Sequence, residues 1–406
     1  MPCDQQARQA AGGSWSHGKR GGLQHLPDSK VLNEQALYYF VDRLVDALED
    51  NMDPAVAQPA VAQPAATGFE ADLRERGAVL SGTQVQYFAD RDAELAALPR
   101  ISTVHPLLSD GLLRVSGADA GTFLQGQLTN DVGELDGDRA QLTAYCTPQG
   151  RMLASLLAWH DHDGYLLQLP RELCDGIRTR LQRYVLRARV KIVDETTSKI
   201  LIGVGGPGTG NLLAEVFDEA PPPMAKFASS DATIIGLGPD LFELVTDASI
   251  AISVWDRVAR HARPAGSPAW QWRLIGAPIP VITAATQEQF VPQMANLEQL
   301  GAVNFTKGCY PGQEIVARSQ YRGEVKRRLF RFHVDTQAAA AGQSIYPADA
   351  AAQAVGVVVN AAPAPAGGCD MLAVVRTDQV ETSGLRLGTT DGPALERLPL
   401  RLSDAA

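Results

Sequence analysis

The chain has 406 residues, more than one ordinary domain holds, so we expect two or three domains. Hydrophobic residues make up 45% of it, and no apolar run approaches the roughly 20 residues of a membrane-spanning helix, which excludes a transmembrane protein. Five widely spaced cysteines without a Cys-x-x-Cys pair exclude a disulfide framework and a self-contained zinc site, and they indicate a reducing compartment. The formal net charge of −10 argues against a general nucleic-acid coat protein but is compatible with local basic patches.

Residues 1–66 are expected to form a disordered or helical N-terminal extension that ends in a Pro/Ala linker. Residues 1–30 mix Gly, Gln, Ser and scattered charges, and they contain no apolar segment typical of a secretory signal. Leu37, Val41 and Leu44 recur at helical spacing and predict one amphipathic helix. The sequence Pro-Ala-Val-Ala-Gln then occurs at 54–58 and again at 59–63, which is typical of a semi-rigid linker.

Three folded domains are expected after the linker, at 67–198, 199–326 and 327–406. In the first, the hydrophobic pattern predicts strands at 112–115, 140–146, 151–159, 165–169 and 189–193, and helices at 69–76, after 119 and at 173–185. In the second, it predicts strands at 200–204, 233–237 and 241–246, and helices at 211–217 and 248–260. The third contains short β segments at 329–334, 355–359 and 372–375 with Pro/Gly breaks. The predicted fold class is α+β, with two ferredoxin-like layers and a small C-terminal β-barrel.

A glycine-rich run at residues 203–208 matches the Gly-x-Gly-x-x-Gly pattern of dinucleotide-binding sites. Pro207 interrupts the run, and the next strand follows a Pro-rich loop at 221–223 instead of completing a βαβ unit. We therefore interpret the run as a glycine-rich turn. The absence of a Gly-Lys-Ser/Thr sequence also excludes a phosphate-binding P-loop.

The loop around Cys309 is the best candidate for chemistry. Gly308 and Gly312 bracket it, Lys307 lies two residues before the cysteine, and a helix is expected to begin directly after Gly312. A nearby ammonium group and free N–H groups at a helix start both favour the thiolate over the thiol, so Cys309 is a candidate functional thiol with Lys307 as its activator. The alternative is a small buried hydrophobe, which is the usual role of a lone cysteine.

The run Lys307-Gly308-Cys309-Tyr310-Pro311-Gly312-Gln313-Glu314 resembles the signature of the YgfZ family, folate-binding proteins related to the T-protein (aminomethyltransferase) of the glycine cleavage system. Segments at 125–132, 150–151, 184–186, 290–293, 296–297 and 322–323 resemble further family positions in the family's order. The resemblance covers about Gly68 to the C-terminus. It implies a three-domain ring of the aminomethyltransferase type whose signature loop faces a folate site.

The resemblance implies tetrahydrofolate, or a one-carbon derivative of it, as the cofactor. A flat pterin with an anionic glutamate tail needs a ring for stacking, polar groups for the pterin edge and cations for the carboxylates. Trp270, ten residues before Pro280, is the stacking candidate at a position where relatives carry a ligand-contacting tryptophan, and a half-buried core indole is the alternative. The other cofactor-binding candidates are Lys307, Tyr310, Gln313, Glu314, Arg318 and Arg322.

Two basic stretches interrupt the acidic composition. Seven basic and two acidic residues lie between 303 and 332, which suits the folate tail or a solvated face. The run from Arg178 to Lys191 contains no acidic residue, and it could contact an anionic partner such as tRNA or face water.

Departures from the relatives bear on activity. Aminomethyl transfer in the T-protein relies on an acidic residue shortly after the turn that corresponds to residues 149–150. This chain has Leu153-Ala154-Ser155 at that place. No group is therefore evident to handle the proton of the transfer reaction, and glycine cleavage is not expected. Many relatives carry a second acidic residue that contacts the pterin edge, and residues 275–278 of this chain contain no acid at that place. Some members of the family also carry a tryptophan where this chain has Ser109-Asp110-Gly111.

The expected function is that of a tetrahydrofolate-binding accessory protein of the YgfZ type. The resemblance connects such proteins with assembly or repair of iron–sulfur enzymes and, through them, with tRNA modification. Expected partners are folate and iron–sulfur enzymes such as tRNA-thiolating proteins, and direct contact with tRNA is a further expectation. No membrane and no metal are expected. The expected compartment is the bacterial cytoplasm rather than the mitochondrion. Two alternatives stay open: a folate-dependent one-carbon transferase, and an interaction scaffold with a decayed folate site.

Overall fold

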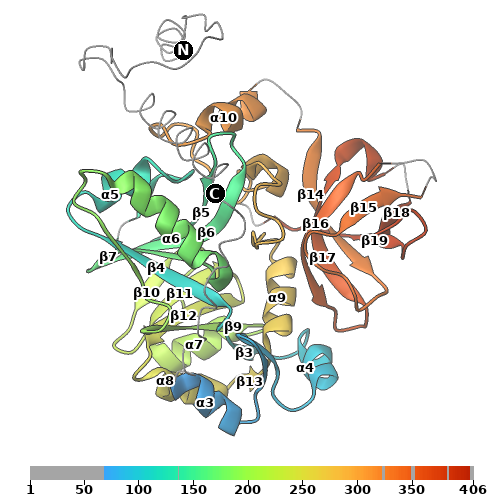
Figure 1. The fold of residues 1–406 in the computed structure, drawn as a ribbon. Helices are drawn as coiled ribbons and strands as arrows, with labels where there is room; N and C mark the ends of the chain where they lie inside the picture. Colours follow the sequence, from blue (N-terminus) through green and yellow to red (C-terminus); the bar gives the residue numbers. More distant parts are fainter. Residues whose placement is uncertain (1–67, 136, 322–324, 349–352, 382–383, 403–406) are drawn as a thin grey trace, which may run out of the picture. The chain divides into compact units, whose positions relative to one another are not determined.

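The computed structural model describes residues 68–135, 137–321, 325–348, 353–381 and 384–402 (Figure 1). The expected N-terminal extension and Arg322 lie outside these ranges. The described chain contains three large sheets and one two-stranded sheet. Within these ranges, no helix has the length and apolar character that crossing a membrane requires.

The first layer is an antiparallel sheet in the order β5-β6-β7-β4-β8. Its strands are β4 (Asp110–Ser116), β5 (Ala140–Cys146), β6 (Met152–Asp161), β7 (Gly164–Pro170) and β8 (Lys191–Asp194). The 3-10 turn η1 (Val132–Glu134) and helices α5 (Ala120–Gln125) and α6 (Arg171–Val185) share its core through Val132, Phe123 and Leu181. The predicted strands and the predicted α6 are confirmed, because period-2 and period-3.6 patterns are strong in this segment.

The second layer is a six-stranded sheet in the order β10-β11-β12-β9-β3-β13, in which β13 pairs with β3 in parallel. Its strands are β3 (Thr103–Pro106), β9 (Lys199–Gly205), β10 (Lys226–Ala228), β11 (Thr233–Gly238), β12 (Leu241–Asp247) and β13 (Arg263–Pro264). Helices α3 (Gly68–Glu75), α7 (Thr209–Phe217) and α8 (Ala251–Ala259) share its core through Leu73, Leu213 and Trp255. The predicted strands β9, β11 and β12 and the helices α3, α7 and α8 are confirmed.

The segment before the first layer belongs to the second. Strand β3 pairs with β9, and Phe69, Val85 and Val104 lie in the same core cluster as Ile202. The small elements β1 (Val79–Ser81), β2 (Gln84–Tyr87) and α4 (Arg91–Ala97) lie in this segment. We therefore propose that residues 68–106 and the segment from 199 onward form one discontinuous domain, a departure from the contiguous boundaries 67–198 and 199–326.

The C-terminal domain is a six-stranded sheet in the order β18-β15-β16-β17-β14-β19. Its elements are β14 (Arg327–Val334), β15 (Ser344–Pro347), β16 (Gly356–Pro363), β17 (Cys369–Arg376), the 3-10 turn η3 (Thr377–Gln379), β18 (Leu385–Leu387) and β19 (Leu395–Leu398). A bridge between Arg386 and Ala394 brings the two edges together, so the sheet is a nearly closed barrel around Phe332 and Val358. The predicted barrel is confirmed.

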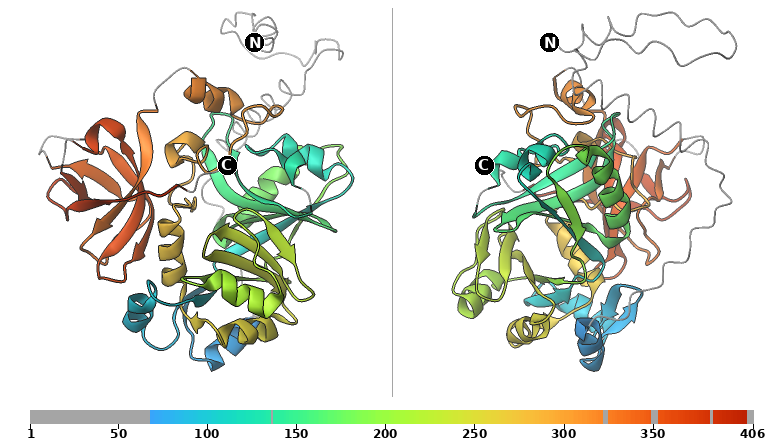
Figure 2. Two further views of the ribbon diagram at one scale, coloured as in Figure 1. Left: turned by 180° about the vertical axis from the view of Figure 1, so that it is seen from behind. Right: turned by 60° about the vertical axis from the view of Figure 1, so that its left-hand side comes forward.

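Helix α9 (Ser267–Gly276) joins the three parts and is not among the predicted elements. It lies between the barrel and the second layer (Figures 1 and 2). Trp272 Nε1 donates to Asp370 Oδ2 of β17 at 2.9 Å, and Arg273 donates to Thr103 of β3. The turn η2 (Pro292–Ala295) and helix α10 (Gln313–Tyr321) follow.

The glycine-rich run at 203–208 is a turn between β9 and α7, as interpreted from the sequence. Strand β9 is antiparallel to both of its neighbours, which differs from the parallel sheet of a dinucleotide-binding fold. A Cβ atom on Gly203 would lie 2.7 Å from the ring of Trp270, so this glycine allows α9 to approach the sheet closely.

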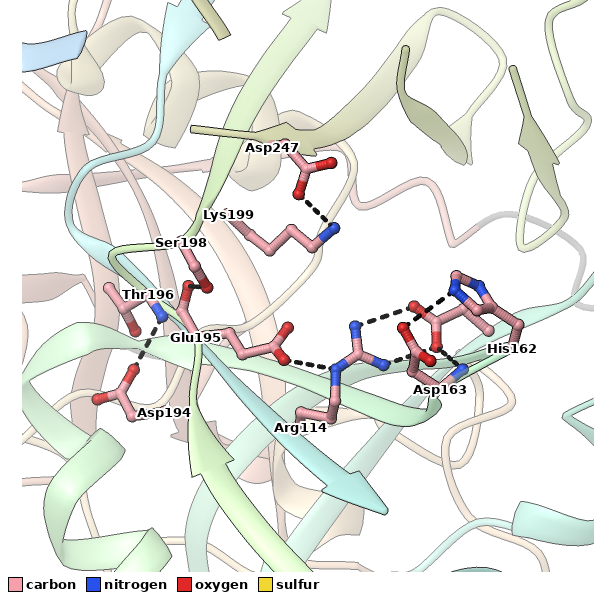
Figure 3. Close-up of polar contacts among 10 residues, drawn as sticks. Arg114, His162, Asp163, Asp194, Glu195, Thr196, Ser198, Lys199 and Asp247 are labelled. Atoms are coloured by element: carbon pink, nitrogen blue, oxygen red, sulfur yellow. Dashed lines mark hydrogen bonds and ion pairs between the residues drawn. The ribbon is translucent and has the colours of Figure 1, made fainter. Parts of the chain in front are cut away.

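A partly buried ion-pair cluster ties the two layers together (Figure 3). Arg114 of β4 donates two hydrogen bonds to Asp161, at 2.6 and 3.0 Å, and a third of 2.6 Å to Glu195. Glu195 lies between β8 and β9, and Lys199 of β9 pairs with Asp247 of β12 at 2.7 Å. Arg114 thus fixes the point where the chain leaves the first layer for the second.

Candidate functional site

A cavity of about 360 Å³ lies between the first layer, the second layer, α9 and the barrel. These four parts contribute, in turn, Leu157 and Gln168, Leu237 and Glu243, Trp270 and Leu274, and Ala340 and Asn360. Most of the lining is apolar, and the volume lies within the range of roughly 300–1,000 Å³ that is typical of small-molecule sites.

One part of the cavity wall carries hydrogen-bonding atoms with no partner in the described part of the chain. Asp110 of β4, Gln168 of β7 and Glu243 of β12 come together here, and Gln168 Nε2 donates to Asp110 Oδ2 at 3.3 Å. Gln168 Oε1 and Glu243 Oε2 are buried acceptors without a donor. Trp270 Nε1 and Ser267 Oγ are buried without a partner as well. Because buried polar atoms are rarely left unsatisfied, these atoms indicate a ligand with at least two donors and one acceptor.

The two acids of the cavity have strongly shifted pKa values. Burial raises the pKa of Asp110 to about 7, although the hydrogen bond from Gln168 opposes the shift. Burial, together with the nearby charge of Asp110, raises the pKa of Glu243 to about 8, although the hydrogen bond from Gln168 opposes the shift. Near neutral pH the pair therefore holds a proton, which it can exchange when a ligand binds. Titratable acids in an apolar cavity are a feature of ligand sites.

Trp270 lines this cavity from α9 and is only 3% exposed. Its ring packs against Gly203 and lies 5.5 Å, centroid to centroid, from the ring of His105. Burial lowers the pKa of His105 to about 3, so this neighbour is neutral. Of the sequence-predicted site residues that the structure describes, Trp270 alone lines the cavity.

The side chain of Lys307 is held by backbone oxygens of another segment of the chain. Its Nζ atom donates to the carbonyl oxygens of Gln125, Leu128 and Asn130, at 2.7, 2.6 and 2.9 Å. Burial lowers its pKa to about 8, and the charge of Asp131 partly opposes the shift. An ammonium group has three hydrogens, and all three are donated to backbone oxygens. Lys307 therefore clamps the signature loop onto residues 125–130.

Cys309 lies exposed on the clamped loop. The next residue, Tyr310, is buried, and Lys307 Nζ lies 5.3 Å from the centroid of its ring. Gly312 follows with φ of +80°, and a Cβ atom there would lie 2.5 Å from the carbonyl oxygen of Thr147. Only glycine suits this position, because both the backbone angle and the close contact with the 147–150 turn exclude a side chain.

The remaining signature candidates lie on α10, away from the cavity. Gln313 is half-buried, and the exposed side chains of Glu314 and Arg318 form an ion pair of 3.7 Å. None of these three described residues lines the cavity. The structure thus separates two features that the sequence analysis joined: an internal cavity around Trp270 and an external loop around Cys309.

Asp110 and Glu243, which line the cavity, were not among the residues predicted from the sequence. Glu243 stands alone in the apolar strand sequence Leu-Phe-Glu-Leu-Val, and a single charge at an inward position of a buried strand is a signal that could have found it. Asp110 gives no comparable signal, because it begins its strand, where acids are common. The segment 275–278, where a pterin acid was looked for, ends α9, and Ile275 lines the cavity.

Exposure of Cys309 predicts selective alkylation. Burial raises the pKa of Cys146 and of Cys174 to about 12 and also raises that of Cys369, so these three thiols should react slowly. Iodoacetamide added to the native protein at neutral pH should label Cys309 first. Peptide mapping by mass spectrometry identifies the labelled site and distinguishes it from Cys3, which lies outside the described residues. Labelling of Cys146 as fast as Cys309 would contradict the burial described here.

Comparison with known proteins identifies relatives in sequence and in structure. No family model matches the chain. The tRNA-modifying protein YgfZ of Yersinia pestis is 36% identical over 222 residues, which cover 54% of this chain and 67% of the relative. The tRNA-modifying protein YgfZ of Escherichia coli O7:K1 is 35% identical over 222 residues, which cover 54% of this chain and 68% of the relative.

The fold is that of a T-protein. The crystal structure of the glycine cleavage system aminomethyltransferase T from Bartonella henselae matches with a TM-score of 0.69 at 16% identity, over 82% of this chain and 96% of that one. The predicted fold class is therefore confirmed. With the sequence identity to the relatives above, the chain belongs to the YgfZ family.

Proposed function

We propose that this protein binds tetrahydrofolate, or a one-carbon derivative of it, in the internal cavity and acts as an accessory protein in tRNA modification. The observation that carries the folate proposal is the set of unpartnered polar atoms in the cavity. The relatives named above are tRNA-modifying proteins, which supports the second part.

The hydrogen-bonding pattern of the cavity fits the edge of a pterin ring. The 2-amino-4-oxo edge of a pterin offers two neighbouring N–H donors followed by a carbonyl acceptor. Glu243 Oε2 and Gln168 Oε1 would accept from the donors, and Trp270 Nε1 or Ser267 Oγ would donate to the carbonyl. An ionised carboxylate oxygen is a stronger acceptor than an amide oxygen, which makes Glu243 the principal anchor.

The apolar remainder of the cavity suits a flat ring, and Trp270 supplies an aromatic contact. Trp270→Ala should weaken binding of 5-formyltetrahydrofolate by about 1–3 kcal/mol because a ring-sized contact is lost. Isothermal titration calorimetry measures the change. Trp270→Phe keeps a ring and should lose less.

Trp255→Phe is the matched control, because this buried indole belongs to the core of the second layer and does not line the cavity. It should lower stability without changing affinity. Unchanged affinity in both Trp270 variants, with reduced stability, would assign Trp270 to the core alone.

A one-carbon transferase remains the second candidate, and the cavity acids favour it. Ser155, in the segment where the T-protein acid was sought, lines the cavity and accepts a hydrogen bond from the backbone N–H of Ile282 at 3.0 Å. Asp110, whose pKa burial raises to about 7, would be the group that handles a proton in the cavity. Tetrahydrofolate, when bound, would supply a carrier for one-carbon groups.

One experiment separates the candidates. The protein is mixed with 5,10-methylenetetrahydrofolate and an amine acceptor such as ammonia, and both folate binding and transfer of the one-carbon group to the acceptor are followed. Stoichiometric binding without product supports the accessory role, and product supports the transferase. No folate binding at all would contradict both proposals and favour the interaction scaffold.

We propose that the exposed Cys309 acts in the accessory role, through iron–sulfur enzymes of tRNA modification in the cytoplasm. Its loop is rigidly clamped by Lys307 while its thiol faces outward, which suits contact with a partner protein. Cys309→Ser should leave folding and folate binding intact and lower tRNA modification in a knockout strain. Full complementation by Cys309→Ser would show that the thiol has no essential role.

A further inference from the structure

A basic ridge forms where α6 ends and β8 begins. We give this name to Arg187, Arg189 and Lys191. All three are exposed, whereas the intervening Ala188 and Val190 are half-buried. The charges therefore recur at every second residue on the solvent side of the segment. None of the three lines the cavity between the layers.

The backbone holds this ridge outward. Leu186, directly before it, has φ of +45° and ψ of −105°, an unusual conformation for a residue with a branched side chain. Its side chain is 63% exposed. Ala188 N then donates to Val185 O at 2.8 Å, and Val190 N donates to Ala188 O at 2.9 Å, so the segment is a fixed turn.

The ridge is a local reversal of charge on an acidic protein. No acidic residue occurs between 178 and 191, while the whole chain carries −10. In this segment Arg189 pairs with Asp119, whose Oδ2 also accepts the backbone N–H of Arg189 at 2.7 Å. Neither Arg187 nor Lys191 forms an ion pair with a residue that the structure describes.

We propose that the basic ridge binds the phosphate backbone of RNA. The proposal deepens the proposed function, on which it rests, by naming a surface for direct contact with tRNA. A row of exposed cations matches a row of phosphates, and phosphate contacts need no apolar surround. The core of a protein–protein interface is, by contrast, depleted of charge. The net negative charge of the whole chain disfavours a polyanion over most of its surface, so contact is expected at a local cluster of cations.

The test measures binding of a fluorescein-labelled, unmodified tRNA transcript by fluorescence anisotropy at several salt concentrations. The triple variant Arg187→Gln/Arg189→Gln/Lys191→Gln should bind more weakly, and the slope of log K against log salt should fall by about 2–3, since each lost phosphate contact contributes about 0.7–0.9. The matched control is Arg91→Gln/Arg100→Gln/Arg260→Gln, which removes three exposed arginines elsewhere and should change neither quantity.

A gain-of-binding variant sharpens the test. Asp119→Asn keeps an acceptor for the backbone N–H of Arg189 and releases its guanidinium, so RNA should bind more tightly and the salt slope should become steeper. A transcript that does not bind at about 50 mM salt, or a triple variant that binds as wild type does, would overturn the proposal. Equal affinity for poly-glutamate would overturn RNA as the occupant and indicate an acidic protein.

Measuring folate affinity in the same variants distinguishes RNA binding at the ridge from folate binding in the cavity. The triple variant should bind 5-formyltetrahydrofolate with wild-type affinity, because the ridge does not line the cavity. Loss of RNA binding with folate binding intact assigns the effect to the ridge. Loss of both would show a folding defect, and a wild-type protein that binds RNA but no folate would contradict the folate proposal alone.

Discussion

Glu243→Gln should weaken binding of a reduced folate by about 3 kcal/mol, roughly a hundredfold. The ionised Oε2 of Glu243 would accept an N–H of the pterin edge in a charge-assisted hydrogen bond, whereas an amide NH2 group in its place would turn a donor toward a donor. Glu243 is 3% exposed, so water cannot replace the lost partner. Calorimetric titration with 5-formyltetrahydrofolate measures the effect. Asp247→Asn, an exposed position on the same strand, is the control and should leave the affinity unchanged.

The pH dependence of binding has a defined sign. The donors of the pterin edge require the ionised form of Glu243, whose pKa is about 8 in the unliganded protein. Affinity should therefore rise between pH 6 and pH 8.5 in the wild type, with release of a proton on binding. The slope should be smaller in Glu243→Gln, where only Asp110 still titrates. A wild-type affinity that falls over this range would contradict the role of the carboxylate.

Glu243→Gln should weaken folate binding but stabilise the ligand-free protein at high pH. A carboxyl whose folded pKa is raised contributes stability below its unfolded pKa near 4, and that stability is lost as the pH rises toward 8. At pH 8.5, without ligand, Glu243→Gln should therefore melt at a higher temperature than the wild type. A variant that binds folate poorly and is also less stable at pH 8.5 would indicate a structural role for Glu243.

Sequence patterns predicted the parts of the fold in which each element carries its own signal. The hairpin of β5 and β6 is an example, because alternating residues flank a turn with Pro148 and with Gly150, whose φ is +73°. Strands β3 and β13 and helix α9 carry weaker signals. Strand β13 has two residues, and α9 contains Trp270 and Trp272 on different sides with a proline in its first turn. The secondary structure of these three segments depends on contacts with distant parts of the chain, which a local sequence pattern does not encode.

The candidate site was predictable only in part, for a related reason. Trp270 was found through its position relative to Pro280, and it lines the cavity. Lys307 was found as a charge beside Cys309, but its partners are three backbone carbonyls about 180 residues earlier in the chain. Asp110 and Glu243 meet across two sheets. Such contacts between residues far apart in the sequence form only in the folded chain, so a sequence motif can identify the residues but not their contact partners.

Arg114→Met should destabilise the protein by about 3–5 kcal/mol. The side chain of Arg114 is 9% exposed, and its guanidinium neutralises Asp161 and Glu195, whose side chains are 22% and 18% exposed. Removal of the arginine leaves two partly buried carboxylates without their partner at the junction of the layers (Figure 3). Urea unfolding followed by circular dichroism measures the loss. Arg76→Met is the control, because its pair with Asp256 is 36% and 44% exposed and should contribute less than about 1 kcal/mol.

The pH dependence identifies the ion pair as the cause. Burial alone would raise the pKa of Asp161, but the hydrogen bonds from Arg114 outweigh burial and hold the pKa below its ordinary value. This stabilisation is present above the unfolded pKa near 4 and is lost as the pH falls through the lower folded pKa. The difference between wild type and Arg114→Met should therefore be largest at neutral pH and shrink in acid. If the difference in unfolding free energy between wild type and variant stays constant down to pH 3, the methionine acts through packing. If the difference shrinks in acid and folate affinity is unchanged, Arg114 is confirmed as the electrostatic link between the two layers.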